Sequence, residues 1–263
     1  MDMMNPLHGV EVVLTRPLGR SAELKAMLEH QGARVVERPL IQICTRYEPS
    51  IANALLRTNQ YEAVIATSAN AVRSAWSICK TTDTASGIWK ADWYCIGRGT
   101  AKAARSLGLS PILFESIKNG QEFASALVEK FGHEMHRCFV FIHGQRADMS
   151  FIHVLQTAGL SVDSIVVYDT LNANVNILEM ESLQLEGTVV YVFYSPSAVE
   201  SLIAQWPDFS ESRTYQTLVV TIGQTTSMVC EHHGILVNGI AKMPTDKDVA
   251  DTILSVVRSE SKN

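Results

Sequence analysis

Four short polar motifs contain the residues of this chain whose types and spacing suit the binding of an anion. Each motif follows an apolar run and has a hydroxyl, amide or glycine residue where a helix should begin. The free backbone N–H groups and the positive dipole end of a helix N-terminus bind carboxylates or phosphates. The candidate binding residues are therefore Ser68, Asn70, Gly97, Thr100, Ser195, Ser197, Gly223 and Thr226. The plainer alternative is that each of them only caps its helix.

An internal repeat favours the binding interpretation. Thr67–Val72 resembles Tyr194–Val199 at an offset of 127 residues, and Ile96–Ala101 resembles Ile222–Ser227 at an offset of 126 residues. Because the motifs recur in the same order at nearly the same offset, the chain is expected to contain two related units.

Two arginines and one tyrosine could add side-chain chemistry. Arg16 and Arg146 follow the expected first strand of each half, where each could pair with a ligand carboxylate. The alternative for both is a solvated surface arginine. Tyr168 corresponds to the apolar Ile41 at the offset of 127 residues. A strand tyrosine is usually a core or interface aromatic, and the alternative is a hydrogen-bond donor or general acid that faces a ligand.

The elements that must position these residues are short strands that alternate with helices. Apolar, largely β-branched or aromatic runs such as Val10–Leu14, Ala63–Ala66, Cys138–Ile142 and Val189–Tyr194 are mostly followed by small residues and a helical pattern. This alternation predicts an α/β fold with doubly wound parallel sheets that are covered on both faces. Open α/β sheets bind ligands outside the carboxyl ends of their strands, so a cleft between two like-sized units is expected.

Length and charge exclude several classes of function. The chain has 263 residues, which suits about two domains, and 22 Lys and Arg against 27 Asp and Glu give a net charge of −5. No basic run exceeds a pair, so nucleic acid is not an expected partner. No apolar stretch approaches the roughly 18 residues of a membrane span, and the first residues do not resemble a secretory signal. Five cysteines without a zinc spacing suit reduced thiols in the cytoplasm.

Motifs for cofactors, metals and nucleophiles are weak or missing. Gly97 and Gly99 lack the third glycine of a dinucleotide-binding loop, and the chain contains neither a P-loop nor G-x-S-x-G. His133 and His136 have no third metal ligand at a suitable spacing. We therefore expect no metal, no cofactor and no covalent nucleophile.

Taken together, these motifs resemble the uroporphyrinogen-III synthase family over roughly Val10 to Leu254. The resemblance rests on Val13–Pro17, Glu37–Ile41, Thr67–Val72, Ile96–Ala101, Val167–Thr170, Ser195–Val199 and Ile222–Thr226. One departure is His143, which precedes Gly144 where the family often has an arginine.

The resemblance implies two similar α/β domains joined by a pair of extended linkers. One domain would be discontinuous and comprise residues 1–38 and 171–263, and the inserted domain would comprise residues 39–170. The linkers would be the strands at Pro39–Ile43 and Ile165–Thr170.

The resemblance also implies a cyclising hydro-lyase that needs no cofactor. It would close the linear tetrapyrrole hydroxymethylbilane to uroporphyrinogen III, with loss of water and inversion of the terminal pyrrole ring, in haem biosynthesis. Tyr168 matches the family tyrosine implicated in the departure of the hydroxyl group, and Thr15 joins the expected substrate-binding residues. We expect a cytoplasmic monomer. The alternatives are a non-catalytic protein that binds an anionic small molecule and a redox enzyme with a bound chromophore.

Overall fold

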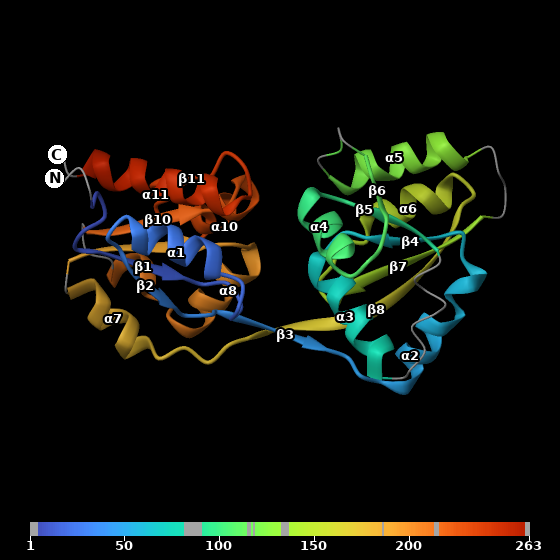
Figure 1. Cartoon of the computed structure of the whole chain (residues 1–263), viewed down its shortest axis with the longest axis horizontal. Coiled ribbons are helices and arrows are strands. Elements are labelled where there is room, and N and C mark those ends of the chain that lie inside the picture. The colour runs from blue at the N-terminus through green and yellow to red at the C-terminus, as the bar shows by residue number, and fades with distance from the viewer. Residues whose placement is uncertain are drawn as a thin grey trace. The chain divides into compact units, whose positions relative to one another are not determined.

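In a computed structural model the chain forms two compact units, and it passes from one to the other within two strands (Figure 1). The structure describes residues 5–81, 91–114, 117, 119–132, 137–185, 187–212 and 216–260, apart from the side chains of residues 58, 59, 184 and 185. Unit 1 consists of Met1–Gln42 and Leu171–Asn263, and unit 2 of Ile43–Thr170.

From the sequence, the first domain boundary was expected after residue 38, whereas the units divide after Gln42. The division falls later because β3 (Ile41–Thr45) pairs with β8 (Ser161–Asn172) in the sheet of unit 2. Both strands run past the division, so β3 and β8 are the two connections between the units.

Unit 1 contains a five-stranded parallel sheet with the strand order β11–β10–β9–β1–β2. One face is covered by α1 and α11, and the other face by α7, α8, α9 and α10. The strands are β1 (Val10–Leu14), β2 (Arg34–Glu37), β9 (Thr188–Phe193), β10 (Thr217–Thr221) and β11 (Gly239–Ile240). The helices are α1 (Ala22–His30), α7 (Ile177–Leu185), α8 (Pro196–Gln205), α9 (Phe209–Ser212), α10 (Gln224–His232) and α11 (Asp246–Glu260).

Unit 2 contains a six-stranded sheet with the order β3–β8–β7–β4–β5–β6, in which the five strands from β8 to β6 are parallel. One face is covered by α2, α3 and α4, and the other face by α5 and α6. The remaining strands are β4 (Ala63–Ala66), β5 (Asp92–Cys95), β6 (Pro111–Leu113) and β7 (Cys138–Gly144). The helices are α2 (Pro49–Leu56), the 3-10 helix η1 (Arg57–Gln60), α3 (Ala69–Thr81), α4 (Arg98–Ser106), α5 (Gly120–Phe131) and α6 (Ser150–Thr157).

The central strands are apolar throughout because both faces of each sheet are buried. In β7, Val140 and Ile142 belong to one core of unit 2, whereas Phe139 and Phe141 belong to the other. This follows from the alternation of side chains along a strand.

The two sheets have the same strand order, although their strands come from both copies of the internal repeat. The order β6–β5–β4–β7–β8 in unit 2 corresponds to β11–β10–β9–β1–β2 in unit 1. The first copy supplies β1, β2, β4, β5 and β6, and the second copy supplies β7 to β11. Apart from β3, which is the additional strand of the sheet in unit 2, each unit therefore combines three strands of one copy with two strands of the other. The predicted α/β fold of two similar, doubly wound parallel sheets is confirmed.

Candidate functional site

The residues singled out in the sequence gather at the carboxyl edge of each sheet. In unit 1, Thr15 and Arg16 follow β1, Ser195 and Ser197 follow β9, and Gly223 and Thr226 follow β10. These three strands are neighbours in the sheet. In unit 2, Ser68 and Asn70 follow β4, Gly97 and Thr100 follow β5, and Arg146 follows β7, while Tyr168 lies in β8. The strands β5, β4, β7 and β8 are neighbours as well.

A contact between two predicted site residues that lie far apart in the sequence joins Ser68 and Tyr168 in unit 2. Their hydroxyl oxygens lie 3.2 Å apart, across 100 residues of sequence. Tyr168 is 9% exposed, and its ring belongs to the core that includes Ile142 and Val167. The ring of Tyr168 therefore packs in the core, while its hydroxyl bonds to a residue at the carboxyl edge.

Ser68 also caps the N-terminus of α3. Its hydroxyl oxygen accepts a hydrogen bond of 3.1 Å from the backbone N–H of Asn70. A hydroxyl in this position satisfies one of the N–H groups that have no partner within the helix. Ser68 thus links the helix N-terminus to the phenol of Tyr168.

An ion pair that the sequence did not predict lies beside Tyr168. Arg46 donates two hydrogen bonds to the carboxylate of Asp169, at 2.8 and 2.7 Å, and its backbone N–H donates to the carbonyl of Val167 at 3.0 Å. The Arg46 guanidinium lowers the pKa of Asp169 from its ordinary value. The bidentate pair at Asp169 and the backbone hydrogen bond at Val167 together connect Arg46 to β8 on both sides of Tyr168. No local signal could have shown it, because its partners are 123 residues apart.

The turn at α4 offers backbone groups rather than side chains. Gly97 has a φ of +79°, which favours glycine, and precedes the first residue of the helix. Thr100 is buried, so its side chain contributes to packing. Arg98, the first helical residue, is exposed and adds a positive charge at this helix N-terminus.

The equivalent turns of unit 1 have the same character. The hydroxyl of Ser195 caps α8 by accepting from the backbone N–H of Ala198 at 3.3 Å, and it lies 3.0 Å from the hydroxyl of Ser197. Gly223 precedes α10 with extended backbone, and Thr226 is buried. Ser195, Ser197 and Gly223 therefore lie where an anion could bind, whereas Thr226, like Thr100, packs inward.

Arg16 already has several partners inside unit 1. It donates to the Ser21 hydroxyl at 3.1 Å and to Asp246 at 3.0 Å, and its guanidinium lies 4.6 Å from the centre of the Tyr194 ring. Burial raises the pKa of Tyr194. These contacts join the end of β1 to the start of α11, which gives Arg16 a structural role.

Thr15 and Arg146 have opposite environments. Thr15 is fully buried, and its hydroxyl donates to the carbonyl of Val192 at 2.6 Å, so its side chain is already used within the sheet. Arg146 is exposed and forms no ion pair within the described part of the chain. Of the two arginines, Arg146 is the one whose guanidinium remains available to a ligand.

The described residues provide no group of three or more His, Cys, Asp or Glu that could hold a metal ion. His133 and His136 lie outside the described residues. Burial raises the pKa of Cys79 to about 11 and that of Cys95 to about 12, so both thiols stay protonated near neutral pH. A protonated thiol is a weak nucleophile, and neither cysteine suits covalent catalysis.

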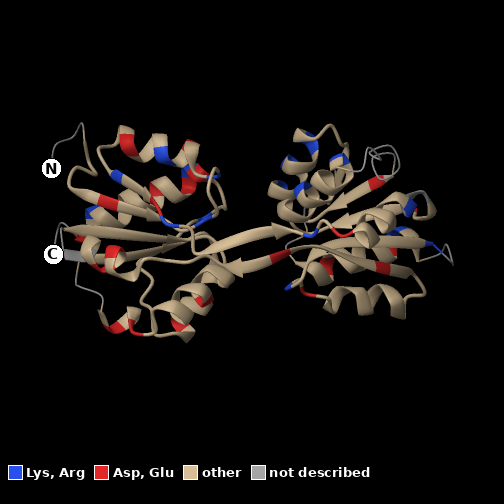
Figure 2. Cartoon of the chain, turned by 90° about the horizontal axis from the view of Figure 1, so that it is seen from below, with Lys and Arg blue, Asp and Glu red and all other residues tan. Residues whose placement is uncertain are grey.

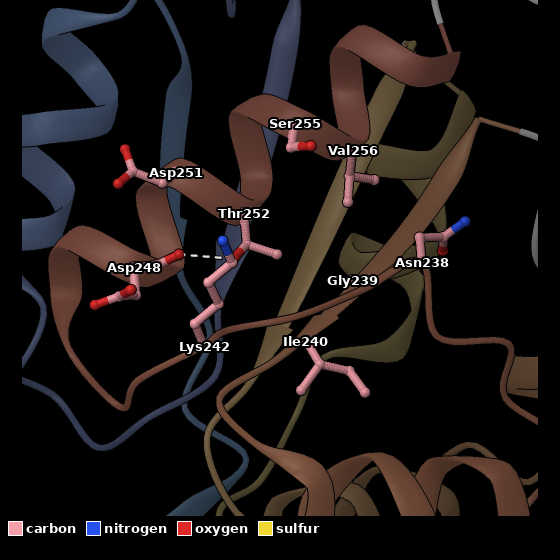
Figure 3. Close-up of a pocket in the computed structure, with 9 residues that line it drawn as sticks. All are labelled: Asn238, Gly239, Ile240, Lys242, Asp248, Asp251, Thr252, Ser255 and Val256. Carbon is pink, nitrogen blue, oxygen red and sulfur yellow. Dashed lines mark hydrogen bonds between the residues drawn. The ribbon is translucent and has the colours of Figure 1, made fainter.

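A pocket of about 420 Å³ lies elsewhere on unit 1, between α11 and the segment that contains β11 (Figure 3). Its lining is mixed: Asn238, Gly239, Ile240, Lys242, Asp248, Asp251, Thr252, Ser255 and Val256. None of the predicted site residues lines it.

Figure 2 shows charged residues of both signs in each unit. In unit 2, α3 and α4 carry Lys and Arg but no Asp or Glu. None of the helices that the structure describes combines the length and the apolar character needed to cross a bilayer.

Comparisons with known proteins agree with one another. A family model described as uroporphyrinogen-III synthase HemD matches residues 22–251. The porphyrin biosynthesis protein HemD of Ruminiclostridium josui is 24% identical over 258 residues, which cover 97% of this chain and 50% of that protein. The chain therefore spans about half the length of this curated relative.

Two solved structures share the fold. A mutant uroporphyrinogen III synthase from the extremely thermophilic bacterium Thermus thermophilus has a TM-score of 0.62 at 17% identity, over 97% of this chain and 100% of that chain. The uroporphyrinogen-III synthetase of Helicobacter pylori has a TM-score of 0.63 at 18% identity, over 94% of this chain and 99% of that chain.

Proposed function

Since the chain belongs to the uroporphyrinogen-III synthase family, we propose that it converts hydroxymethylbilane to uroporphyrinogen III. The hydroxyl group leaves the terminal hydroxymethyl carbon as water, and the electron-rich pyrrole stabilises the resulting azafulvene. The substituted carbon of the last ring then attacks, and rearrangement through a spiro intermediate inverts that ring. The task of the protein is to hold the flexible substrate so that this carbon attacks rather than the unsubstituted one.

The observation that carries this proposal is the hydroxyl pair of Ser68 and Tyr168 at the carboxyl edge of unit 2, 3.2 Å apart. A neutral phenol can donate a hydrogen bond to the departing hydroxyl group and so assist its loss as water. Ser68 is both the partner of this phenol and the cap of α3, so it orients the phenol relative to the helix N-terminus.

Helix N-termini at both carboxyl edges suit a substrate with many carboxylates. In unit 2 the starts of α3 and α4 offer backbone N–H groups, and Arg146 adds an exposed guanidinium. In unit 1 the starts of α8 and α10 offer equivalent groups beside Ser195, Ser197 and Gly223. We assign these residues to substrate binding. Thr15, Arg16, Thr100 and Thr226 contribute by holding the turns in place, since their side chains face inward or are already bonded.

The decisive experiment is an isomer assay. The purified protein is given freshly prepared hydroxymethylbilane, and the products are oxidised to porphyrins and separated by chromatography. We expect mainly the type III isomer, formed faster than spontaneous closure. Only type I porphyrin at the spontaneous rate would contradict the proposed activity, and saturable substrate binding without type III product would favour the non-catalytic alternative.

The remaining expectations belong to the same proposal. The reaction needs no cofactor, so we expect full activity after exhaustive dialysis against a chelator. None of the five cysteines forms a disulfide bond, which suits a reducing cytoplasm. We also propose that the protein acts as a monomer, and light scattering at assay concentration should return a mass near 29.0 kDa.

A further inference from the structure

The ring of Tyr168 lies directly on the backbone of Gly144. The two residues face each other in the pairing of β7 with β8. A Cβ atom added to Gly144 would lie 2.3 Å from Cζ and 2.7 Å from the hydroxyl oxygen of Tyr168. Such distances are far below van der Waals contact, so the phenol occupies the space that any other side chain at position 144 would fill.

The pairing of β7 with β8 is irregular at Gly144, and the extra residue lies on β8: His143 pairs with Val166 and Gly144 with Tyr168, which leaves Val167 without a counterpart on β7. The register of β7 against β8 shifts between His143 and Gly144, which is the signature of a β-bulge. Past the bulge, the N–H of Gln145 donates to the carbonyl of Tyr168 at 3.0 Å. The position of Tyr168 relative to the carboxyl edge of the sheet therefore depends on the backbone conformation at this bulge.

His143 holds the β7 backbone opposite this bulge. Its Nδ1 lies 2.9 Å from the carbonyl oxygen of Gly144, which also accepts from the N–H of Ala147 at 3.0 Å. Because a carbonyl oxygen can only accept, Nδ1 carries the proton and the imidazole is the Nδ1–H tautomer. The ring is stacked on Phe141, with centroids 4.6 Å apart, and is only 5% exposed.

The second ring nitrogen of His143 lowers the stability of the fold in this arrangement. Nε2 is buried and has no hydrogen-bond partner among the described residues. Leaving a buried acceptor unpaired costs roughly 1–3 kcal/mol. Packing alone would be better served by an apolar side chain in this position, so the donor at Nδ1 is the feature that a histidine adds.

We propose that His143 and Gly144 are positioning residues for Tyr168: the imidazole holds the β7 backbone opposite the bulge, and the missing side chain of Gly144 lets the phenol reach Ser68. This inference rests on the proposed function, because it assigns a purpose to the placement of the phenol. Because it concerns the position of the Tyr168 ring, it can also be tested by a measurement that does not depend on catalysis.

The test compares two substitutions of His143. His143→Leu removes the donor and keeps an apolar side chain against Phe141, whereas the side-chain N–H of His143→Asn can occupy the place of Nδ1–H. We expect His143→Leu to lower kcat by roughly tenfold or more with little change in KM, because misplacement by about 1 Å can cost a hundredfold. His143→Asn should retain most of the wild-type kcat. His153→Leu, at an exposed histidine on α6 of the same unit, is the matched control and should leave kcat unchanged.

A second readout follows the phenol directly. The protein is labelled with tyrosine carrying carbon-13 at Cζ, and the signal of Tyr168 is assigned by its loss in Tyr168→Phe. We expect this signal to move in His143→Leu and in Gly144→Ala, and to keep its wild-type position in His143→Asn and His153→Leu. If Gly144→Ala does not fold, the His143 pair still decides.

An unmoved Tyr168 signal in His143→Leu, or equal losses of kcat in the Leu and Asn variants, would overturn the positioning role. The two proposals fail separately. If the wild-type protein forms no type III isomer, the proposed function fails, while the Tyr168 signal still decides whether His143 sets the position of the ring.

Discussion

At the scale of single residues, the chemistry assigned to this protein depends on one phenol whose two ends have different surroundings. The ring of Tyr168 is packed in a core, and its hydroxyl is bonded to the Ser68 hydroxyl at a sheet edge. A buried ring limits the motion of the hydroxyl, so the donor is already oriented before substrate arrives.

Tyr168→Phe should therefore separate the two roles. The substitution keeps the ring and its packing but removes the donor, so we expect kcat for type III formation to fall on the order of a hundredfold with little change in stability. Rates are measured with fresh hydroxymethylbilane, and unfolding is followed by circular dichroism. Tyr47→Phe, at an exposed tyrosine of the same unit, is the control. Wild-type turnover in Tyr168→Phe would make Tyr168 a core aromatic only.

His143 should make the stability of the protein depend on pH. An unfolded histidine has a pKa of about 6.5, and burial lowers the pKa of His143 in the folded protein. The folded protein then binds fewer protons here than the unfolded chain at pH values between the two. The free energy of unfolding is therefore not reduced by this histidine above about pH 6.5–7, and it decreases as the pH falls below that range.

Urea unfolding at pH 7.5 and pH 5.5 measures this effect. We expect the wild-type protein to lose more unfolding free energy between these pH values than His143→Asn, which has no titrating group at this position. Equal losses in the two proteins would show that other groups cause the acid sensitivity. Because each protein is compared with itself at the two pH values, any effect of the substitution on stability that does not depend on pH cancels.

At the scale of elements, the helix N-termini have two roles that one series of substitutions can separate. Ser195 caps α8 through its hydroxyl, and the same helix end is assigned to a substrate carboxylate. Capping needs a side-chain acceptor, whereas anion binding needs the local charge to stay neutral or positive.

Ser195→Ala should lower the unfolding free energy by about 1 kcal/mol because it removes the cap. Ser195→Asn and Ser195→Asp should both restore much of this stability, since both offer a capping oxygen. Only the Asp variant should raise KM, because its carboxylate repels a polyanionic substrate. Thermal unfolding and steady-state kinetics give the two quantities. If KM is the same in the Asn and Asp variants, no substrate carboxylate binds at this helix end.

At the scale of the whole molecule, the two units differ in continuity although they share a strand order. Unit 2 is a single segment with a complete sheet and two cores of its own. Unit 1 needs β1 and β2 from the start of the chain beside β9 to β11 from its end. The contacts that form both cores of unit 2 are therefore made within this one segment, without the rest of the chain.

A fragment of residues 43–170 should fold alone and give a single cooperative urea transition with native-like near-ultraviolet circular dichroism. A fragment of residues 171–263 lacks β1 and β2, which leaves one side of β9 unpaired and both cores of unit 1 incomplete, so we expect no cooperative transition. A 43–170 fragment that binds hydrophobic dyes and unfolds gradually would contradict the independence of unit 2.

Sequence alone was sufficient to predict the class of fold and the edge at which the candidate residues lie. The alternation of buried strands and helices is a local property of the chain, as are the polar turns that begin α3, α4, α8 and α10. The repeat showed two related copies, and the resemblance to a family added that one domain is discontinuous. These signals are local because burial on both faces of a sheet, and capping of a helix, each act on consecutive residues.

Only the tertiary structure decided which residues of that edge have free side chains and which are already bonded. Thr15 and Arg16 have internal partners, Arg146 is exposed, and Arg46 pairs with Asp169 across 123 residues. The place of Gly144 beneath the Tyr168 ring depends on the register of two strands and a bulge. Pairings of this kind join residues far apart in the chain, and their identity follows from packing in three dimensions, which no local pattern of residues encodes.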